Sequence, residues 1–386
     1  MGGVSMEWKE VTLGEIAIFK TGKLNSNAAI SNGEYPFFTC SPETLRINSY
    51  AFDQEAILLA GNNAEGNFSI KYYTGKFNAY QRTYVITPIR GKVDIKFLYY
   101  ALSLCLKQLK NMSQGTSTKF LTVTILNSFS VKLPSISNQR RIASILSSLD
   151  RKIELNNKIN ADLEEMAQAI FKNWFVDFEP FKDGKFVDSE LGMIPEGWKV
   201  GRLTEIASYM NGLAMQKFPP ENIEDSLPVL KIKELGQGFC GTDSDRCSCN
   251  IKDECKIHNG DVIFSWSGTL LVDVWCGGDC GLNQHLFKVT SNDYPKWFYY
   301  YWTKHHLQEF IRIAKDKAVT MGHIKRGHLE EAMVAIPDND SMEKAHELFE
   351  PILSKMISLR LENSRLFLLR DTLLPRLMSG EIEVPE

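Results

Sequence analysis

Two long stretches of the chain share one hydrophobic pattern, and this repeat constrains the fold more than any other feature. The first stretch runs from about Ile136 to Trp174 and contains neither glycine nor proline. Its apolar positions recur at alternating intervals of four and three residues, which is the pattern of a coiled-coil seam rather than of a general core-facing stripe. At a rise of about 1.5 Å per residue, such a helix is on the order of 55–60 Å long. The pattern therefore predicts a helix that acts as a spacer.

The same alternation returns from Ser341 onward, where each seam position lies 203 residues after its counterpart in the first stretch. Asn160 and Asn363 hold equivalent places in the two patterns, so we expect them to hydrogen-bond and set the register of the helices. Pro351 interrupts the second pattern, and we expect that helix to bend or to begin near it. The predicted seam comprises Ile142, Leu146, Leu149, Ile153, Asn156, Asn160, Leu163, Ala167, Ile170 and Trp174 in the first helix, and Ala345, Phe349, Ile352, Met356, Leu359, Asn363, Leu366, Arg370, Leu373 and Leu377 in the second.

The stretches outside these helices also repeat. Trp8 and Gly22 match Trp198 and Gly212 at an offset of 190, Asn78-Ala-Tyr80 matches Asn283-Gln-His285 at 205, and Pro134 matches Pro337 at 203. The offset changes only by loop-sized insertions, as expected of a tandem duplication. The chain is therefore predicted to run as a globular unit, a helix, a second globular unit and a second helix.

Each globular stretch combines short β-rich runs, at 56–59, 82–87, 229–232, 261–265 and 286–289, with one helix, at 97–112 or 297–314. The second long helix buries its seam most economically by lying back along the first, which gives an antiparallel two-helix coiled coil with pseudo-two-fold symmetry. We therefore expect an α+β fold with two similar mixed α/β domains. The predicted boundaries are 1–134 for the first domain, 135–180 for its spacer helix, 181–337 for a linker and the second domain, 338–380 for the second spacer helix, and 381–386 for a tail.

Composition limits the class of protein. No apolar run reaches the roughly 18–20 residues that span a bilayer, and the opening MGGVSMEWKE lacks the apolar core of a signal peptide. We therefore expect a cytoplasmic protein without a membrane partner. The formal net charge of −3 argues weakly against a nucleic-acid partner, but residues 1–134 carry 14 basic against 9 acidic side chains.

Several motifs carry a family resemblance. The run QRRIASILSSLDRKIELNNKINADLEEMAQAIFKNWFVDF and the later IPEGW closely resemble type I restriction–modification specificity subunits, as do the openings WKEVTLGEIAIFKTG and WKVGRLTEIASYMNG and the ending LLPRLMSGEIEV. The similarity extends over essentially the whole chain. Two positions depart from the family pattern. Asn138 replaces a usual glutamate, and Ala318 stands where the first unit has Gly115.

The resemblance implies a division of labour. Each globular unit would be a target-recognition domain that reads one half of a bipartite double-stranded DNA site. The helices would set the gap between the half-sites and dock two methyltransferase subunits, and translocase-nuclease subunits would join the complex. It implies no cofactor in this subunit, since S-adenosylmethionine, ATP and Mg²⁺ would belong to the partners.

Two alternatives stay open, a standalone DNA-modifying enzyme and a scaffold of the same architecture without a DNA role. Motifs for the enzyme are missing. The only adjacent prolines, in Phe218-Pro-Pro-Glu221, do not form an Asn/Asp-Pro-Pro-aromatic loop, and no P-loop is present. Salt-sensitive binding to duplex DNA would separate a DNA-binding subunit from the scaffold.

Six of the eight cysteines lie between Cys240 and Cys280. Structural zinc is typically held by Cys-x₂₋₄-Cys pairs, and only Cys276-x₃-Cys280 has that spacing, because Cys247-x-Cys249 is too tight. Ordinary thiols in an inserted loop are the favoured interpretation, and no metal site is assigned. A zinc site stays the alternative.

Basic and amide side chains in predicted loops are the candidate DNA contacts. Phosphates attract Lys and Arg, whereas base edges bind Arg, Lys, Asn, Gln, Ser and Thr. The candidates are Lys20, Lys23, Asn62, Asn63, Lys71, Arg82, Gln114, Thr116, Ser117 and Lys119 in the first unit, and Gln216, Lys217, Lys231, Lys233, Ser267, Thr269, Lys315, Lys317, Thr320, His323, Lys325 and Arg326 in the second.

Overall fold

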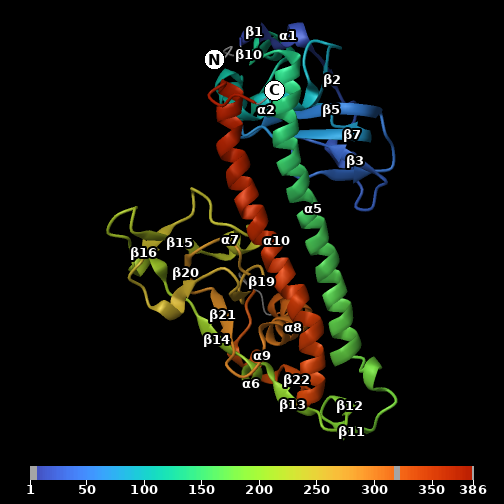
Figure 1. Ribbon diagram of the computed structural model, residues 1–386, viewed down its shortest axis with the longest axis vertical. Helices are drawn as coiled ribbons and strands as arrows, with labels where there is room; N and C mark the ends of the chain where they lie inside the picture. The colour runs from blue at the N-terminus through green and yellow to red at the C-terminus, as the bar shows by residue number, and fades with distance from the viewer. Residues whose placement is uncertain (1–6, 317–321, 385–386) are drawn as a thin grey trace. The chain divides into compact units, whose positions relative to one another are not determined.

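The computed structural model describes residues 7–316 and 322–384, and the chain divides into two compact units. Unit 1 comprises Met1–Lys152 and Leu366–Glu386, and unit 2 comprises Ile153–Arg365. The two long helices, α5 (Ile136–Phe175) and α10 (Asn339–Ser379), each contribute residues to both units (Figure 1). Unit 1 is therefore built from both ends of the chain. None of the helices described is long and apolar enough to cross a membrane.

Unit 1 is organised around a six-stranded sheet in the order β2-β8-β5-β7-β3-β4, in which only β3 and β7 are parallel. The strands are β2 (Ala17–Thr21), β3 (Tyr35–Phe38), β4 (Leu45–Ile47), β5 (Phe52–Ala60), β7 (Ile70–Ala79) and β8 (Thr83–Pro88). The shorter elements are β1 (Lys9–Thr12), α1 (Leu13–Ile16), β6 (Asn62–Asn63), α2 (Ile95–Leu104), α3 (Leu106–Met112), β9 (Lys119–Phe120), α4 (Val123–Ser128) and β10 (Ser130–Leu133). β1 pairs with β10 and β6 with β9. The predicted helix at 97–112 is thus two helices that meet at Cys105.

Hydrophobic burial ties the end of the chain into unit 1. Leu377 of α10 and Val384 of the tail belong to the same buried cluster as Leu13 and Ile142. Gly380 lies so close to Trp8 that an added Cβ would be 2.6 Å from the indole Nε1. Because burying one large aliphatic side chain contributes about 1.5–3 kcal/mol, these residues are part of the core rather than an appendage.

Unit 2 has two four-stranded sheets, β14-β21-β18-β19 and β16-β15-β20-β17, and two strand pairs, β11-β12 and β13-β22. The strands are β11 (Phe186–Ser189), β12 (Gly192–Pro195), β13 (Lys199–Arg202), β14 (Ser208–Asn211), β15 (Ser226–Leu230), β16 (Arg246–Ser248), β17 (Lys256–Ile257), β18 (Val262–Ser265), β19 (Leu271–Val274), β20 (Cys280–Leu282), β21 (Leu286–Thr290) and β22 (Met333–Ile336). The helices are α6 (Leu203–Ile206), α7 (Ile232–Gln237), α8 (Lys296–Asp316) and α9 (Arg326–Glu331). All five predicted strand runs of the chain lie within or overlap strands.

Strand pairing defines which positions of the two units are equivalent. Thr21, Tyr84 and Leu59 lie side by side across β2, β8 and β5, and Asn211, Phe287 and Phe264 do so across β14, β21 and β18. The middle strands are therefore related by an offset of 203. This register corrects the sequence match made at 205, because Tyr80, not Asn78, is the counterpart of Asn283. Tyr80 forms a parallel β-bridge to Leu24 in the loop after β2. Asn283 forms the equivalent bridge to Leu213 in the loop after β14.

Aromatic side chains form the core where the long helices meet unit 2. Phe171 and Phe175 of α5 are buried, and Trp297 of α8 stacks on Phe349 of α10 with ring centroids 4.7 Å apart. The seam pattern missed both phenylalanines, since Ala167, Phe171 and Phe175 follow one another at intervals of four. A helix that packs on a globular core uses a wider stripe than a two-helix seam.

The predicted seam positions are buried or half-buried without exception. Ile142, Leu146 and Leu377 are buried in unit 1, and Ile153, Ile352, Met356 and Leu359 are buried in unit 2. The expectation that the second helix begins near Pro351 is wrong, because α10 is helical from Asn339 onward. Pro351 is itself exposed, so its ring faces away from the buried stripe.

The buried asparagines pair differently from the expectation. Asn156 Nδ2 donates to Asn363 Oδ1 (2.9 Å) and to Glu362 Oε2 (2.8 Å), and Asn363 Nδ2 donates to Asn157 Oδ1 (2.8 Å). Asn160 is not the partner of Asn363, and its Oδ1 is buried without a hydrogen bond among the described residues.

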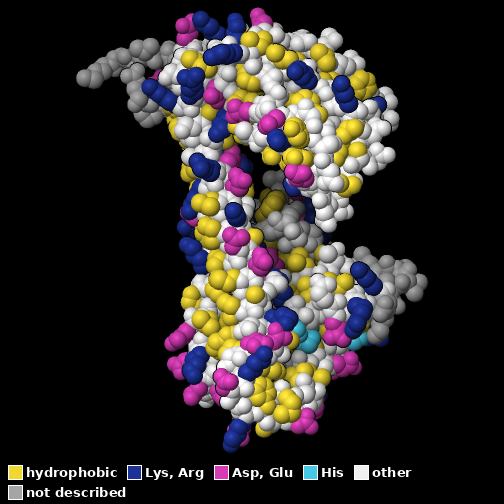
Figure 2. All heavy atoms as spheres, turned by 90° about the vertical axis from the view of Figure 1, so that its right-hand side faces the viewer, with side chains coloured by type: hydrophobic (Ala, Val, Ile, Leu, Met, Phe, Trp, Pro, Cys, Tyr) yellow, Lys and Arg dark blue, Asp and Glu magenta, His cyan; other side chains and the backbone are white. Residues whose placement is uncertain are grey.

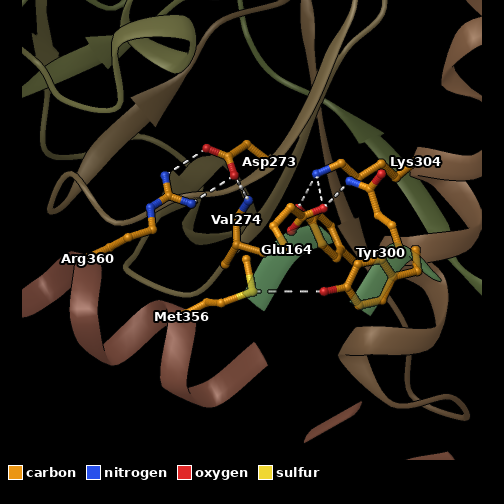
Figure 3. Close-up of polar contacts among 9 residues, drawn as sticks. Glu164, Asp273, Val274, Tyr300, Lys304, Met356 and Arg360 are labelled. Carbon is orange, nitrogen blue, oxygen red and sulfur yellow. Dashed lines mark hydrogen bonds and ion pairs between the residues drawn. The ribbon is translucent and has the colours of Figure 1, made fainter. Parts of the chain in front are cut away.

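Polar contacts also join the long helices to each unit. In unit 2, Glu164 of α5 and Lys304 of α8 form an ion pair at 2.5 Å, and Arg360 of α10 donates to both carboxylate oxygens of Asp273 at 2.8 and 2.7 Å (Figure 3). In unit 1, Asp150 of α5 accepts from Tyr100 (2.5 Å) and from Arg370 (2.9 Å). Burial raises the pKa of Tyr100, so its hydroxyl stays protonated and donates.

The asparagine contact generates a stability prediction. We expect Asn363→Ala to lower the free energy of unfolding by about 1–3 kcal/mol, because it removes one of the two acceptors of the Asn156 amide and the donor to Asn157 Oδ1. The exposed neighbour variant Ser364→Ala is the control. Replacing Asn156 and Asn363 together with leucine should instead raise stability while removing a polar marker of register. Denaturant unfolding measures both effects, and equal stability of Asn363→Ala and Ser364→Ala would contradict the argument.

A second prediction concerns acid. The His306 side chain is only 12% exposed, and burial lowers the pKa of its imidazole below the usual 6.5. The unfolded chain therefore binds this proton more readily, so the free energy of unfolding should fall as the pH drops below about 6.5. His306→Gln can keep a hydrogen bond to Met333 O, which lies 2.9 Å from Nε2. This variant should lose less stability than the parent between about pH 7 and 5, and an identical loss would refute the assignment.

Candidate nucleic-acid interface

In unit 1, several loops meet at the end of the sheet where β2 finishes and β8 begins. Gln81 N–H donates to Leu24 O (2.9 Å), which ties the turn before β8 to the loop after β2. Gly61 N–H donates to Arg82 O (2.8 Å), which ties the end of β5 to the same turn. Phe120 pairs with Asn62, so the loop that precedes it joins the group. We define edge 1 as residues 20–24, 61–63, 81–82 and 114–119.

Most candidates of unit 1 lie on edge 1. Lys20 and Lys23 are exposed beside a hollow of about 640 Å³, which Phe52 and Asn78 also line. The other candidates on this edge are Asn62, Asn63, Arg82, Gln114, Thr116, Ser117 and Lys119, of which all but Asn62, Asn63 and Lys119 are exposed. Gly115 shapes the loop, because its φ is +96° and an added Cβ would lie 2.1 Å from Thr118 O.

Lys71 differs from the other candidates of unit 1. Its ammonium donates to Ser41 O and to Thr44 Oγ1, both at 3.2 Å, and lies 5.8 Å from the Phe38 ring centroid. Burial lowers the pKa of this group. A cation already bound inside the protein is a poor phosphate ligand, so the geometry assigns Lys71 to the structure of the adjoining loop.

Unit 2 forms the equivalent edge at the end of β14, the end of β18 and the start of β21. Ser267 and His323 form an isolated antiparallel β-bridge through their backbones. Beside it, Gly268 N–H donates to Gly322 O (2.9 Å), and Ile324 N–H donates to Trp266 O (3.0 Å). Leu213 N–H donates to Leu282 O (2.9 Å). We define edge 2 as residues 212–217, 266–269, 283–285 and 322–323.

His285 stands at the centre of edge 2. Its Nδ1 lies 3.1 Å from Ser267 Oγ, and its ring centroid is 5.9 Å from that of Trp266. Ser267 is 6% exposed, whereas His285 is exposed. A buried hydroxyl and an indole therefore hold an imidazole that can reach a ligand.

The candidates of unit 2 divide among several places. Gln216 and Lys231 line a hollow of about 490 Å³ together with His285, and Thr269 and Lys315 line one of about 290 Å³. Lys231 forms an ion pair with Asp245, as Lys233 does with Asp243 at 2.6 Å, which raises the pKa of Lys233. Lys217 and His323 are exposed. Lys317 and Thr320, like Ala318, lie outside the described residues.

Arg326 and Lys325 are not brought onto edge 2. Arg326 Nη2 donates to Tyr209 O (3.3 Å). The Arg326 side chain also lines a separate hollow of about 350 Å³ at the start of β14 and the end of β21. Glu205, Asp293 and Glu330 line the same hollow. Because carboxylates repel phosphate, these neighbours disfavour Arg326 as a phosphate contact. Lys325 is exposed next to it at the start of α9.

Arg246, Gln284 and His285 are among the polar residues that line the hollow of about 490 Å³ in unit 2 but were not predicted from the sequence. Arg246 carries internal hydrogen bonds to Ser226. A signal for the other two is present in the sequence, because at the offset of 203 Gln81-Arg82 aligns with Gln284-His285. The match made at 205 hides this correspondence.

The described residues on the face of unit 1 drawn in Figure 2 do not form a single basic patch. Figure 2 shows one face of unit 1, where Lys and Arg side chains are spread among hydrophobic and acidic ones. All eight cysteines are free thiols, and no group of three or more His, Cys, Asp and Glu side chains gathers as a metal site among residues 7–316 and 322–384. The candidate interface is thus built from scattered cations and amides on two equivalent edges.

Comparisons with known proteins point in one direction. The family described as type I restriction modification DNA specificity domain matches residues 6–165 and 195–361. The type I restriction enzyme EcoDI specificity subunit of Escherichia coli is 39% identical over 233 residues, and the match covers 55% of this chain and 51% of that protein. The chain thus spans about half the length of this relative.

A second relative is matched over more of its length. The MjaIX specificity subunit of Methanocaldococcus jannaschii is 32% identical over 321 residues, and the match covers 78% of this chain and 72% of that protein. Among solved structures, a type I restriction-modification S subunit from M. genitalium has a TM-score of 0.61 at 16% identity, with 97% of each chain covered. This likeness shows a shared fold.

A glycine on edge 2 allows a test that needs no partner. An added Cβ at Gly212 would lie 2.2 Å from Leu282 O, and one at its counterpart Gly22 would lie 1.6 Å from Ala79 O. We expect Gly212→Ala to lower the unfolding free energy by more than about 1 kcal/mol, because backbone must shift to admit the methyl group. Gly236→Ala in α7, where nothing lies within 4 Å, should not destabilise. Equal stability of the two variants would contradict the close approach.

Proposed function

Since the family match and the M. jannaschii relative show that the chain belongs to the type I restriction–modification DNA specificity family, we propose that it recognises the DNA sequence for such a system. Unit 1 and unit 2 each read one half of a bipartite site in double-stranded DNA. Specificity subunits are non-catalytic components of these systems, so the chain is proposed to carry out no chemistry of its own.

One observation carries this proposal. The two units place polar and basic side chains at the same end of equivalent sheets, on edge 1 and edge 2. Exposed Lys20 and Lys23 on edge 1, Lys217 on edge 2 and Lys315 beside edge 2 supply charges for phosphates. Amide, hydroxyl and imidazole groups lie between them, and these are the groups that read base edges. A protein with two similar but non-identical edges suits a DNA site with two different halves.

The long helices are proposed to act as the spacer. The contact of Asn156 with Asn363 and the burial of the predicted seam support an antiparallel coiled coil with pseudo-two-fold symmetry. In such an arrangement the pairing of heptads, rather than either domain, sets the gap between half-sites. The domain boundaries at 134, 180, 337 and 380 follow from the same arrangement.

The helices also offer a surface to partners. Phe367, Leu368 and Leu369 of α10 are 41%, 71% and 46% exposed, and Leu155 and Met166 of α5 are 51% and 44% exposed. Large apolar side chains exposed on a helix are candidates for protein association. We assign them to the docking of two methyltransferase subunits, with translocase-nuclease subunits joining the complex. S-adenosylmethionine, ATP and Mg²⁺ would act in those cytoplasmic partners.

Salt dependence tests the proposal. With the methyltransferase partner bound, affinity for duplex DNA should fall linearly on a log–log plot against salt. Lys20→Ala or Lys23→Ala should weaken binding to all sequences alike and reduce the slope by about 0.9 for each phosphate that the variant no longer binds. Lys132→Ala on β10, outside the six-stranded sheet, is the matched control and should leave the slope unchanged. Binding that is absent or insensitive to salt would support a scaffold without a DNA role and refute the proposal.

A further inference from the structure

We propose that Arg82 in unit 1 and His285 in unit 2 are the base-reading residues of their half-sites, and that they occupy one and the same position in the duplicated fold. This inference rests on the proposed function, because it assigns roles within edges 1 and 2. It says which side chains carry sequence specificity rather than general affinity for DNA.

The equivalence follows from backbone pairing. Tyr84 and Phe287 are equivalent because each lies between matched residues of the strands on both sides. Arg82 and His285 each stand two residues before them, in the turn that opens the middle strand. The neighbouring bridges repeat as well, since Asn62 pairs with Phe120 and Ser267 pairs with His323. Arg82 and His285 therefore occupy equivalent backbone positions in two copies of the edge.

Both residues are exposed side chains on a restrained backbone. Arg82 O accepts from Gly61 N–H, and His285 N–H donates to Asn283 Oδ1 (3.2 Å). In unit 2 the ring is restrained further, because Ser267 Oγ engages Nδ1 and leaves Nε2 for a ligand. A restrained position of this kind favours base reading, since mobile surface lysines contribute affinity but little discrimination.

Unmatched polar atoms lie beside both residues. Asn62 Oδ1 in unit 1, and Gln284 Oε1 and Trp266 Nε1 in unit 2, are buried and have no hydrogen-bond partner among the described residues. Asn62 follows Gly61, the donor to Arg82 O, and Gln284 and Trp266 adjoin His285 in sequence and in ring contact. Buried polar atoms are normally paired, so the polar groups beside Arg82 and His285 are not all satisfied within the described part of the protein. Base edges in a DNA groove present donors and acceptors of the required kinds.

The chemistry differs between the two copies. A guanidinium makes two parallel hydrogen bonds to O6 and N7 of guanine, so Arg82 favours a half-site that contains a guanine at this position. His285 can offer only Nε2, which gives one hydrogen bond and weaker discrimination. The substitution of one residue type for the other at an equivalent position therefore provides a physical reason for two different half-sites.

The test is selection from a pool of duplexes with randomised sequence, using the full chain in complex with its methyltransferase subunit. Arg82→Ala should lower preference at one G·C pair of one half-site by roughly 5- to 150-fold, which is the discrimination that one bidentate pair supplies. His285→Ala should relax one position of the other half-site by a smaller factor. In both variants the slope of affinity against salt should change far less than it does when a phosphate-binding lysine is removed.

Matched controls remove the same groups elsewhere. Arg90 lies past the opposite end of β8, and His258 lies before the opposite end of β18. Neither Arg90→Ala nor His258→Ala should alter the selected sequence. Uniform weakening on all sequences with a smaller salt slope would make Arg82 a phosphate contact and overturn the inference. Unchanged selection by both edge variants would overturn it as well. If the unmodified complex selects no sequence, the proposed function fails instead, so the two failures are distinguishable.

Discussion

Neither unit has a complete hydrophobic core without residues from both long helices. Ile142 of α5 and Leu377 of α10 are buried together in unit 1, and Phe175 of α5 and Phe349 of α10 are buried together in unit 2. Because burial of large apolar side chains is the main favourable term in folding, the helices cannot be removed or shifted without exposing both cores. The helices that we propose as the spacer are thus part of the core of each unit.

Polar contacts make the packing of the long helices on each unit specific. Asp150 contacts Arg370 in unit 1, whereas Glu164 contacts Lys304 in unit 2. The charged partners are not the same in the two units, although the apolar pattern is duplicated. The polar contacts between the long helices and unit 1 therefore differ from those with unit 2. This difference disfavours binding of either domain at the position of the other. The buried Asn156–Asn363 contact plays the same part within the helix pair.

The helices, the strand runs and the duplication could be predicted from the sequence. Each element must bury one face, so its apolar residues recur at the period of a helix or a strand. The sequence does not reveal the pairing of asparagines, since Asn160 and Asn363 are equivalent in a repeat but only antiparallel geometry decides that Asn363 meets Asn156. The equivalence of Arg82 and His285 is likewise not apparent from the sequence match. A two-residue error in offset separates Arg82 from His285, and only strand register restores their equivalence. Nor could composition reveal that Lys71 and Lys231 already have internal partners.

We propose that two unequal edges, held by one helix pair, read two different half-sites at a constant separation. Mapping of methylated bases across the genome of cells that carry this chain and its methyltransferase subunit tests it most directly. We expect one interrupted sequence with two dissimilar halves and a single gap length, and loss of that methylation when the chain is deleted. An uninterrupted site, a gap of variable length, or a pattern that persists without the chain would contradict it.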